Sequence, residues 1–245
     1  MAMRGPHRGA RLPYRTLAGV VPYARGWLAA SAKLQGITMA PEEPQVFSSF
    51  LEVLDYKPAY QVVALFAPVG LLDEPTPGGR TCDRDARRLL GRPRSSAVVS
   101  APSRPALGPS SFAEAVQANG GHLSPVSWRQ MGRIAEVDAN IAPYWQRTVF
   151  EVHPELSLFQ LNDDRPVRFS KHTRAGIEER VALLLERFPG VERVVEARIP
   201  GVRAPQLVDA AACLWTARRI VSRGVSRLPD EPEWDGLGLR MEIVR

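Results

Sequence analysis

The chain has 245 residues, of which 44% are hydrophobic, so it is long enough to bury a full core and we expect one α/β domain. No apolar run approaches the roughly 20 residues that a membrane-spanning helix requires, so we expect no membrane partner. The formal net charge is +6, but residues 1–15 supply four arginines and no acid, so the charge alone does not indicate nucleic-acid binding.

The N-terminal residues and the cysteines indicate the compartment. Residues 1–15 have no apolar core behind their arginines, so they do not form a secretory signal and are predicted to be a flexible basic arm. The two cysteines, Cys82 and Cys213, lack the spacing of a metal site and are expected to be buried thiols. Both features favour a reducing, cytoplasmic location.

The first part of the chain has the pattern of a β-hairpin, a helix and a buried strand. Two short apolar runs flank the turn-rich residues 22–26. Apolar side chains at helical spacing predict a helix over Val46–Tyr56. A later apolar run ends at Pro68 and is typical of a strand buried on both faces. The strands of this part are predicted at Thr16–Val21, Trp27–Leu34, Gly36–Met39 and Gln61–Ala67.

The region over residues 72–142 has weaker strand signals. Helices are predicted over Arg84–Leu90 and Pro125–Ile141. The Ser/Pro-rich stretch Arg92–Ser111 is predicted to be loop, with one short extended piece at Ala97–Val99. We therefore expect a helical and loop insertion that covers one end of the sheet.

The remainder alternates between strand and helix patterns. The segment Val191–Ala197 fits either a strand or a short helix. Strands first, followed by alternating helices and strands, predict a mixed α/β fold over residues 16–245. The other elements are strands at Thr148–Val152 and Leu237–Val244 and helices at Thr173–Phe188 and Ala204–Arg223.

Five segments share their motifs with one bacterial family. They are Thr81–Gly91, Val149–Ser157, Ser170–Arg180, Val208–Ala217 and Trp234–Val244. Together they resemble the family named domain of unknown function 429, a predicted nuclease family with an RNase H-like fold. The resemblance implies an RNase H-like mixed sheet flanked by helices, with the 72–142 insertion. It also implies a cluster of carboxylates that holds two Mg²⁺ or Mn²⁺ ions for cleavage of a phosphodiester.

Two acids that the resemblance implies are absent. The family ends two early strands in aspartate, and those positions are Val21 and Phe66 here. Its acidic pair before a late helix is Pro205-Gln206, while Asp209 in that helix remains. Valine and phenylalanine offer no oxygen to a hard cation. The resemblance therefore implies a degenerate site.

The surviving acids supply the candidate catalytic and metal-binding residues. Glu151 and His153 are expected on one face of a strand end, because side chains alternate along a strand. Glu155 follows Pro154 in a new turn, from which it can approach the same point. We expect Glu151, Asp209 and His153 to be the catalytic candidates. Glu151, Glu155 and Asp209 are the candidate metal ligands.

Each candidate also has a purely structural interpretation. Glu151 and His153 can belong to a polar strand face, and an acid such as Asp209 near a helix start is favoured by the helix dipole alone. Lys171 and Thr173 are candidates for phosphate binding at a helix start, although a capped, solvated helix would have the same sequence.

Two further charged groups are expected to be structural. Four basic residues on one predicted helix are interleaved with acids, which favours a salt-bridged surface over a nucleic-acid contact. Glu136 and Asp138 diverge by about 200° on a helix and cannot share one ion, so we expect surface positions with at most one structural role. The four basic residues are Arg80, Arg84, Arg87 and Arg88.

Three functional hypotheses remain open. The first is a degenerate nuclease scaffold that is weakly active or non-catalytic and binds or regulates. The second is an active Mg²⁺- or Mn²⁺-dependent nuclease with a rebuilt site, and its partner would be nucleic acid. The third is a nucleotide or small-molecule binding protein that uses the helix start at Lys171–Thr173 and needs no metal.

Overall fold

The hairpin at the start of the chain organises the main sheet. The computed structural model describes residues 14–245, so the predicted arm over residues 1–15 lies outside the described residues except for its last two positions. Strands β1 (Arg15–Tyr23) and β2 (Gly26–Gln35) pair antiparallel, and Tyr23 faces Gly26 across a two-residue turn. The predicted hairpin is confirmed, with longer strands and a shorter turn.

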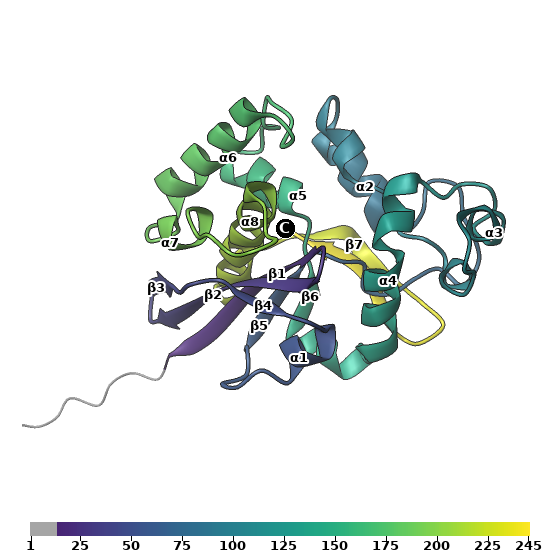
Figure 1. Ribbon diagram of the computed structural model, residues 1–245, viewed down its shortest axis with the longest axis horizontal. Helices are drawn as coiled ribbons and strands as arrows, with labels where there is room; N and C mark the ends of the chain where they lie inside the picture. The colour runs from purple at the N-terminus through teal and green to yellow at the C-terminus, as the bar shows by residue number, and fades with distance from the viewer. Residues whose placement is uncertain (1–13) are drawn as a thin grey trace, which may run out of the picture.

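The described sheet has six strands and mixes both pairing directions (Figure 1). Its main path runs β3-β2-β1-β5-β6, with β4 beside β2. β5 is parallel to β1, and β6 is parallel to β5. The mixed α/β class predicted from the sequence is confirmed. The other strands of this sheet are β3 (Thr38–Pro41), β4 (Gln45–Phe47), β5 (Val62–Leu65) and β6 (Val149–Glu151).

Helix α8 (Ala204–Val221) covers one face of the sheet. A Cβ at Gly19 would lie 2.2 Å from the Ala210 carbonyl oxygen, so only glycine permits the close approach of α8 to β1. The apolar cluster beneath α8 is the largest in the described chain and includes residues of three other helices. The other helices of this face are α5 (Pro154–Leu161), α6 (Arg174–Arg187) and α7 (Glu192–Val195).

The opposite face is covered by α1 and α4. The cluster on this face surrounds the buried Trp27 and Phe50 rings, whose centroids are 5.3 Å apart. The prediction of one helix over Val46–Tyr56 is partly wrong. Gln45–Phe47 pairs with β2 as β4, and the helix starts only after the Ser49 cap, because the sheet edge captures the first apolar residues. α1 spans Phe50–Leu54 and α4 spans Pro125–Asn140.

The region over residues 72–142 consists of helices and loops, as its weak strand signals predict. α4 ends one residue before the predicted Ile141, while α2 begins three residues before the predicted Arg84. The extended piece predicted at Ala97–Val99 is partly wrong, because Ala97 ends the 3-10 helix η1 (Arg94–Ala97), whereas Val98 is extended. The division of the chain into one domain with an insertion stays a prediction. The remaining elements are α2 (Thr81–Leu90), η2 (Arg104–Leu107), α3 (Phe112–Ala118) and η3 (Pro143–Arg147).

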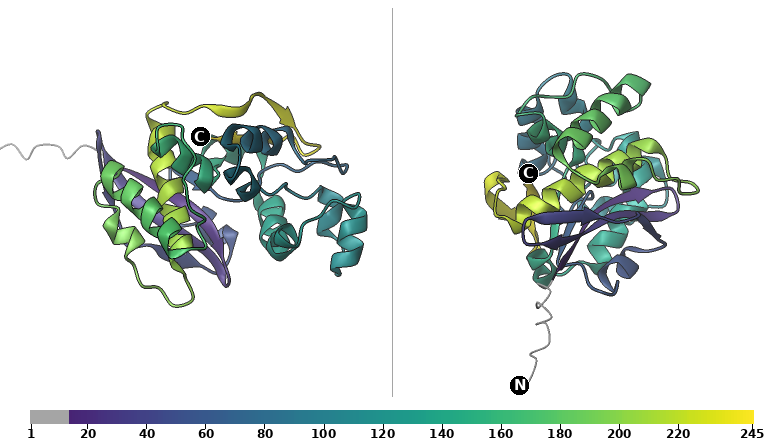
Figure 2. Two further views of the ribbon diagram at one scale, coloured as in Figure 1. Left: turned by 90° about the horizontal axis from the view of Figure 1, so that it is seen from above. Right: turned by 90° about the vertical axis from the view of Figure 1, so that its left-hand side faces the viewer.

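A second sheet forms at the C-terminus. β7 (Arg227–Trp234) and β8 (Arg240–Val244) pair antiparallel, and β8 meets β6 through a single bridge between Val152 and Val244. Figure 2 shows this hairpin in yellow along one side of the molecule, next to α2. β7 contains Pro229 and Pro232, and the sequence does not predict this strand because proline cannot donate a hydrogen bond to a neighbouring strand. No helix within residues 14–245 is both long and apolar enough to cross a membrane.

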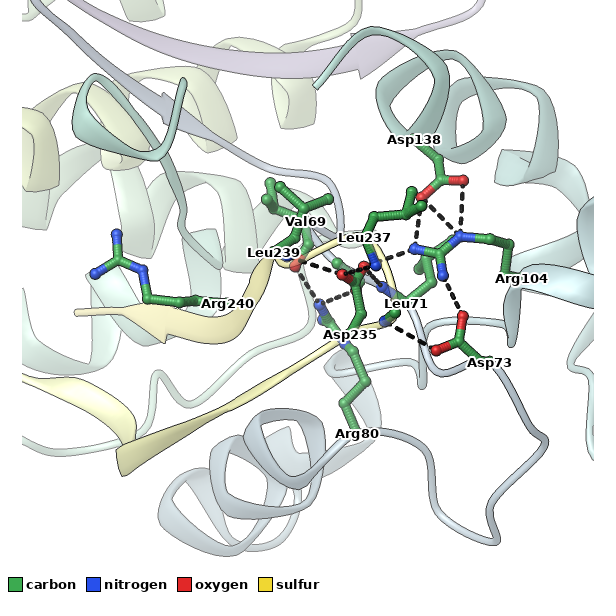
Figure 3. Close-up of polar contacts among 12 residues, drawn as sticks. Val69, Leu71, Asp73, Arg80, Arg104, Asp138, Asp235, Leu237, Leu239 and Arg240 are labelled. Atoms are coloured by element: carbon green, nitrogen blue, oxygen red, sulfur yellow. Dashed lines mark hydrogen bonds and ion pairs between the residues drawn. The ribbon is translucent and has the colours of Figure 1, made fainter. Parts of the chain in front are cut away.

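One buried arginine–carboxylate hub joins the second sheet to the 72–142 region (Figure 3). The side chain of Asp235, in the β7–β8 turn, is fully buried and accepts backbone N–H groups of Leu71 and Leu239 at 3.1 and 2.8 Å. Arg104 of η2 donates to Asp235 at 2.6 Å and also bridges Asp138 of α4. Asp138 is therefore structural, and so is Glu136, which accepts the Trp27 indole N–H at 3.0 Å. The expected surface positions are wrong, because both side chains are half-buried and both make long-range contacts.

Removing the Asp235 carboxylate should destabilise the fold. We expect Asp235→Ala to lower the free energy of unfolding by about 3 kcal/mol or more, because Arg104 and two buried N–H groups lose their acceptor. Urea unfolding monitored by tryptophan fluorescence measures this. The matched control, Asp230→Ala in the same hairpin, removes an exposed carboxylate and should change stability by less than about 0.5 kcal/mol. Equal effects of the two changes would contradict the role of the hub.

Candidate functional site

The positions singled out by the family resemblance lie along one edge of the sheet. β1, β5 and β6 are parallel, and their carboxyl ends carry Val21, Phe66 and Glu151. The backbone N–H of Phe66 donates to the Val20 carbonyl oxygen at 2.7 Å, and Leu65 pairs with Glu151. The carboxyl ends of parallel strands are where α/β folds build their sites. This edge is therefore the candidate site.

The side chains at this edge divide between the two faces of the sheet. Phe66 packs with the cluster under α8, and so does Val21, which is 1% exposed. Their neighbours Val20 and Leu65 pack with the opposite cluster. Glu151, paired with Leu65, points to the side of α2. Val21 and Phe66 therefore pack on the α8 side of the sheet, whereas Glu151 contacts Arg80 at the start of α2.

Glu151 is neutralised by a buried arginine that directly precedes α2. The Arg80 guanidinium, 1% exposed, donates to both carboxylate oxygens of Glu151 at 2.6 and 2.8 Å. Glu151 also accepts the Val69 backbone N–H at 2.7 Å. Burial raises the pKa of Glu151, and the bidentate contact with Arg80 opposes that shift. Both carboxylate oxygens of Glu151 thus accept N–H groups of the protein.

The same guanidinium holds a second acid. Arg80 donates to Asp83 at 2.8 Å, and Asp83 in turn accepts the backbone N–H of Ala101 at 3.0 Å. Burial would lower the pKa of Arg80, but the attraction of Asp83 and Glu151 outweighs it and keeps the pKa well above its ordinary value. Arg80 therefore connects the sheet edge, α2 and the loop that contains Ala101.

Asp209 is neutralised by Lys171. The Lys171 ammonium lies 2.7 Å from Oδ2 of Asp209, and the Asp209 side chain is 7% exposed. The same ammonium lies 5.7 Å from the centre of the Phe66 ring, within cation–π range. Burial would lower the pKa of Lys171, but the Asp209 carboxylate outweighs it and the pKa is raised. The ring of Phe66, at a position where the resemblance implies an acid, thus contacts a cation.

Glu155 is neutralised by Arg180. Glu155 lies in the first turn of α5, and its Oε1 accepts from the Arg180 guanidinium at 2.8 Å. The Arg180 side chain is fully buried and also donates to the carbonyl oxygens of Phe169 and Gly176. Burial raises the pKa of Glu155, and Arg180 opposes that shift. Each of the three candidate metal ligands therefore has its own cationic partner.

His153 caps α5 and stays neutral. Its Nδ1 accepts the backbone N–H of Glu155 at 3.2 Å, and its ring meets the Phe66 ring edge-on at 4.9 Å. Burial, together with the nearby Lys171 charge, lowers the pKa of His153 to about 3. At neutral pH the imidazole carries no extra proton, so it has none to give as a general acid.

The two candidate phosphate-binding residues also have intramolecular partners. Lys171 is paired with Asp209, as described above. The Thr173 hydroxyl accepts the Gly176 N–H at 3.1 Å and donates to the Ser170 carbonyl oxygen at 2.8 Å. Thr173 is the N-cap that the sequence predicts, and its hydroxyl is fully used by the cap.

A cavity of about 490 Å³ brings the candidate residues together. Its lining includes Glu151, His153, Glu155 and Lys171, together with Phe66, which directly follows β5. Neither Asp209 nor Thr173 is part of the lining. Within residues 14–245, no three His, Cys, Asp or Glu side chains are placed to hold a common metal ion. The donor set of this edge therefore does not fit the pair of ions that the resemblance implies.

The sequence does not predict the arginine partners of Glu151 and Glu155. Arg80 was expected on a salt-bridged surface and is buried, whereas Arg88 of the same helix does pair with Asp85 at the surface, at 2.6 Å. Arg180 lies within the helix predicted over Thr173–Phe188, where its burial is not evident from the sequence. Gly176, four residues before Arg180, is the feature of the sequence that indicates this contact. Because Gly176 has no Cβ, the Ser170 carbonyl can pack against it, and Arg180 donates to the Gly176 carbonyl oxygen.

Comparison with known proteins places the chain in a family. A family model described as a protein of unknown function (DUF429) matches residues 19–234, and the chain belongs to this family. No curated protein and no solved structure matches the chain.

Removing the Arg80 charge should leave two buried carboxylates without a partner. We expect Arg80→Met to lower the free energy of unfolding by about 3–5 kcal/mol, the cost of breaking one side of a buried ion pair. Chemical denaturation of both proteins measures the difference. Arg88→Met on the same helix is the control and should cost less than about 1 kcal/mol, because that pair is exposed. A small effect of Arg80→Met would contradict the assignment.

The neutral His153 should make the fold acid-sensitive. Its pKa is about 3 in the fold and about 6.5 when unfolded, so the unfolded chain binds more protons and stability falls as the pH drops below about 6.5. Between pH 8 and 5.5 this residue should account for about 1 kcal/mol of lost stability. Asparagine keeps a capping acceptor but does not titrate, so His153→Asn should reduce the loss by that amount in urea unfolding at both pH values. An unchanged pH dependence would show that His153 is not the group responsible.

Proposed function

We propose that this family member is a binding protein on an RNase H-like scaffold, in which internal cations have replaced catalytic metal ions. The observation that carries the proposal is that Glu151, Glu155 and Asp209 each contact a cation, Arg80, Arg180 and Lys171 respectively, at 2.6 to 2.8 Å. The charge of each of these three acids is therefore opposed by a side chain of the protein, without a metal ion.

The strand arrangement supports the RNase H-like part of the proposal. The chain forms three antiparallel strands first, β1 to β3, and then adds β5 and β6 in parallel, with helices between and after them. This is the layout that the resemblance leads one to expect. The positions of Val21, Phe66 and Glu151 on three neighbouring strand ends agree with it.

The chemistry of the ion pairs argues against hydrolysis. A divalent ion at Asp209 would have to displace Lys171, and it would then face the Phe66 ring instead of a carboxylate. Mg²⁺ and Mn²⁺ require oxygen ligands in number. Arg80 likewise occupies both oxygens of Glu151. The missing metal ligands and the added cations both weaken the binding of a divalent ion at this site.

One atom favours the alternative, an active nuclease with a rebuilt site that uses Mg²⁺ or Mn²⁺. Oδ1 of Asp209 is buried and has no hydrogen-bond partner within residues 14–245. A buried carboxylate oxygen without a donor is costly and is a common feature of functional sites. Asp209 is therefore the residue on which the two proposals differ most sharply.

A cleavage assay tests the proposal. Labelled single-stranded, duplex, hybrid and branched nucleic acids are incubated with the protein in Mg²⁺ or Mn²⁺, beside an Asp209→Asn variant. We expect no metal-dependent cleavage by the parent protein. Cleavage by the parent that disappears in Asp209→Asn would overturn the proposal, while cleavage that persists in the variant would indicate a contaminating nuclease.

A restored site provides the positive counterpart. Val21→Asp, Phe66→Asp and Lys171→Ala, combined, return two carboxylates and remove the competing cation. We expect this variant to bind Mn²⁺ where the parent does not, because oxygen ligands then outnumber cations around Asp209. Isothermal titration calorimetry compares the two proteins, and circular dichroism verifies that the variant is folded.

A further inference from the structure

We infer that the cavity beside Glu151 binds a small phosphorylated ligand that also carries an apolar ring, the chemistry of a mononucleotide, and that it does so without a metal ion. The inference rests on the proposed function, because it assigns a ligand class to the same binding site.

Charge is the first argument. Six basic side chains line the cavity against three acidic ones, and Asp209, the partner of Lys171, adds a fourth acid. Three of the six are the cations that neutralise the site acids. The other three, Arg94, Arg129 and Arg203, have no carboxylate partner within residues 14–245. Cations left without counter-charges in a concave site attract anions.

Arg94 supplies a buried donor that awaits an acceptor. One end of its guanidinium donates to the Phe169 carbonyl oxygen at 3.3 Å. Its Nε atom is buried and has no hydrogen-bond partner among residues 14–245. A buried N–H group without an acceptor costs free energy, and an anionic oxygen at this point would relieve that cost. Arg94 therefore brings to the cavity lining a guanidinium with one unsatisfied donor.

The three arginines approach the cavity from opposite sides. Arg94 lies in η1 and Arg129 in α4, both within the 72–142 region, whereas Arg203 precedes α8. Figure 1 shows α4 on one side of the sheet edge and α8 on the other. A phosphate has three peripheral oxygens and can accept from several guanidinium groups at once, which favours phosphate over a carboxylate here.

The remaining lining is apolar and suits a ring. Val99 and Val126 line the cavity and are 36% and 39% exposed, so their apolar surface is open to a ligand. Phe66 contributes part of an aromatic face. The volume of about 490 Å³ falls within the range of about 300–1,000 Å³ that is typical of small-molecule sites. A compact ligand with one ring fits these conditions better than a polymer that only follows a basic surface.

The test is a calorimetric titration in the presence of EDTA. The probes are adenosine monophosphate, adenosine, inorganic phosphate and a short single-stranded oligodeoxynucleotide. We expect adenosine monophosphate to bind at least about tenfold more tightly than adenosine or phosphate alone, because the site uses both parts of the ligand.

The variants locate the binding site. Arg129→Ala and Arg203→Ala each remove an exposed guanidinium of the cavity and should weaken adenosine monophosphate binding about tenfold or more. The control, Arg147→Ala, removes an exposed arginine outside the lining and should leave the affinity unchanged. Equal melting temperatures show that all three variants keep the fold.

Three results would overturn the inference: no binding of adenosine monophosphate, equal binding of adenosine, or affinity unaffected by both cavity variants. Tighter binding of the oligonucleotide than of the mononucleotide would also overturn it, in favour of a nucleic-acid surface. Because EDTA is present throughout, none of these results depends on hydrolysis. Metal-dependent cleavage would instead contradict the proposed function, so the two failures can be told apart.

Discussion

The pairing of Arg80 with Glu151 is the constraint on which the candidate site depends. A carboxylate buried at the end of β6 is tolerated only if a positive charge reaches it, and Arg80 does so from α2 with two hydrogen bonds. Because Arg80 also holds Asp83, and Asp83 holds the Ala101 backbone, one guanidinium fixes the sheet edge, the helix and the following loop together. The same loop region supplies one wall of the cavity.

Two other ion pairs neutralise buried acids of α5 and α8 in the same way. Arg180 of α6 contacts Glu155 of α5, and Lys171, in the segment that precedes α6, contacts Asp209 of α8. A metal-dependent site instead keeps its acids free of internal cations, so that their repulsion is relieved when the ions arrive. Here the repulsion between the carboxylates is relieved by the protein's own side chains, Arg80, Arg180 and Lys171. The apolar Val21 and Phe66 add no negative charge to this end of the sheet, and the Phe66 ring contacts Lys171.

The sequence patterns predicted most of the main sheet and the long helices, because hydrophobic periodicity directly reports which faces are buried. They failed where tertiary contacts decide the outcome. β4 exists because β2 offers an edge to Gln45–Phe47, and β7 pairs despite two prolines. The acids of the site were found from the resemblance, but their partners were not, since Arg80 and Arg180 are indistinguishable in sequence from solvated arginines on helices. Only the fold shows which arginines are buried.

Binding of Mn²⁺, followed by electron paramagnetic resonance, tests the central claim most directly. The free Mn²⁺ signal reports how much of the ion the protein removes from solution. The account predicts that the parent protein leaves this signal unchanged, because Lys171 and Arg80 already occupy the carboxylates that an ion would need. Loss of one equivalent of free Mn²⁺ with the parent, and its return in Asp209→Asn, would contradict the account and show that the acid site still holds metal.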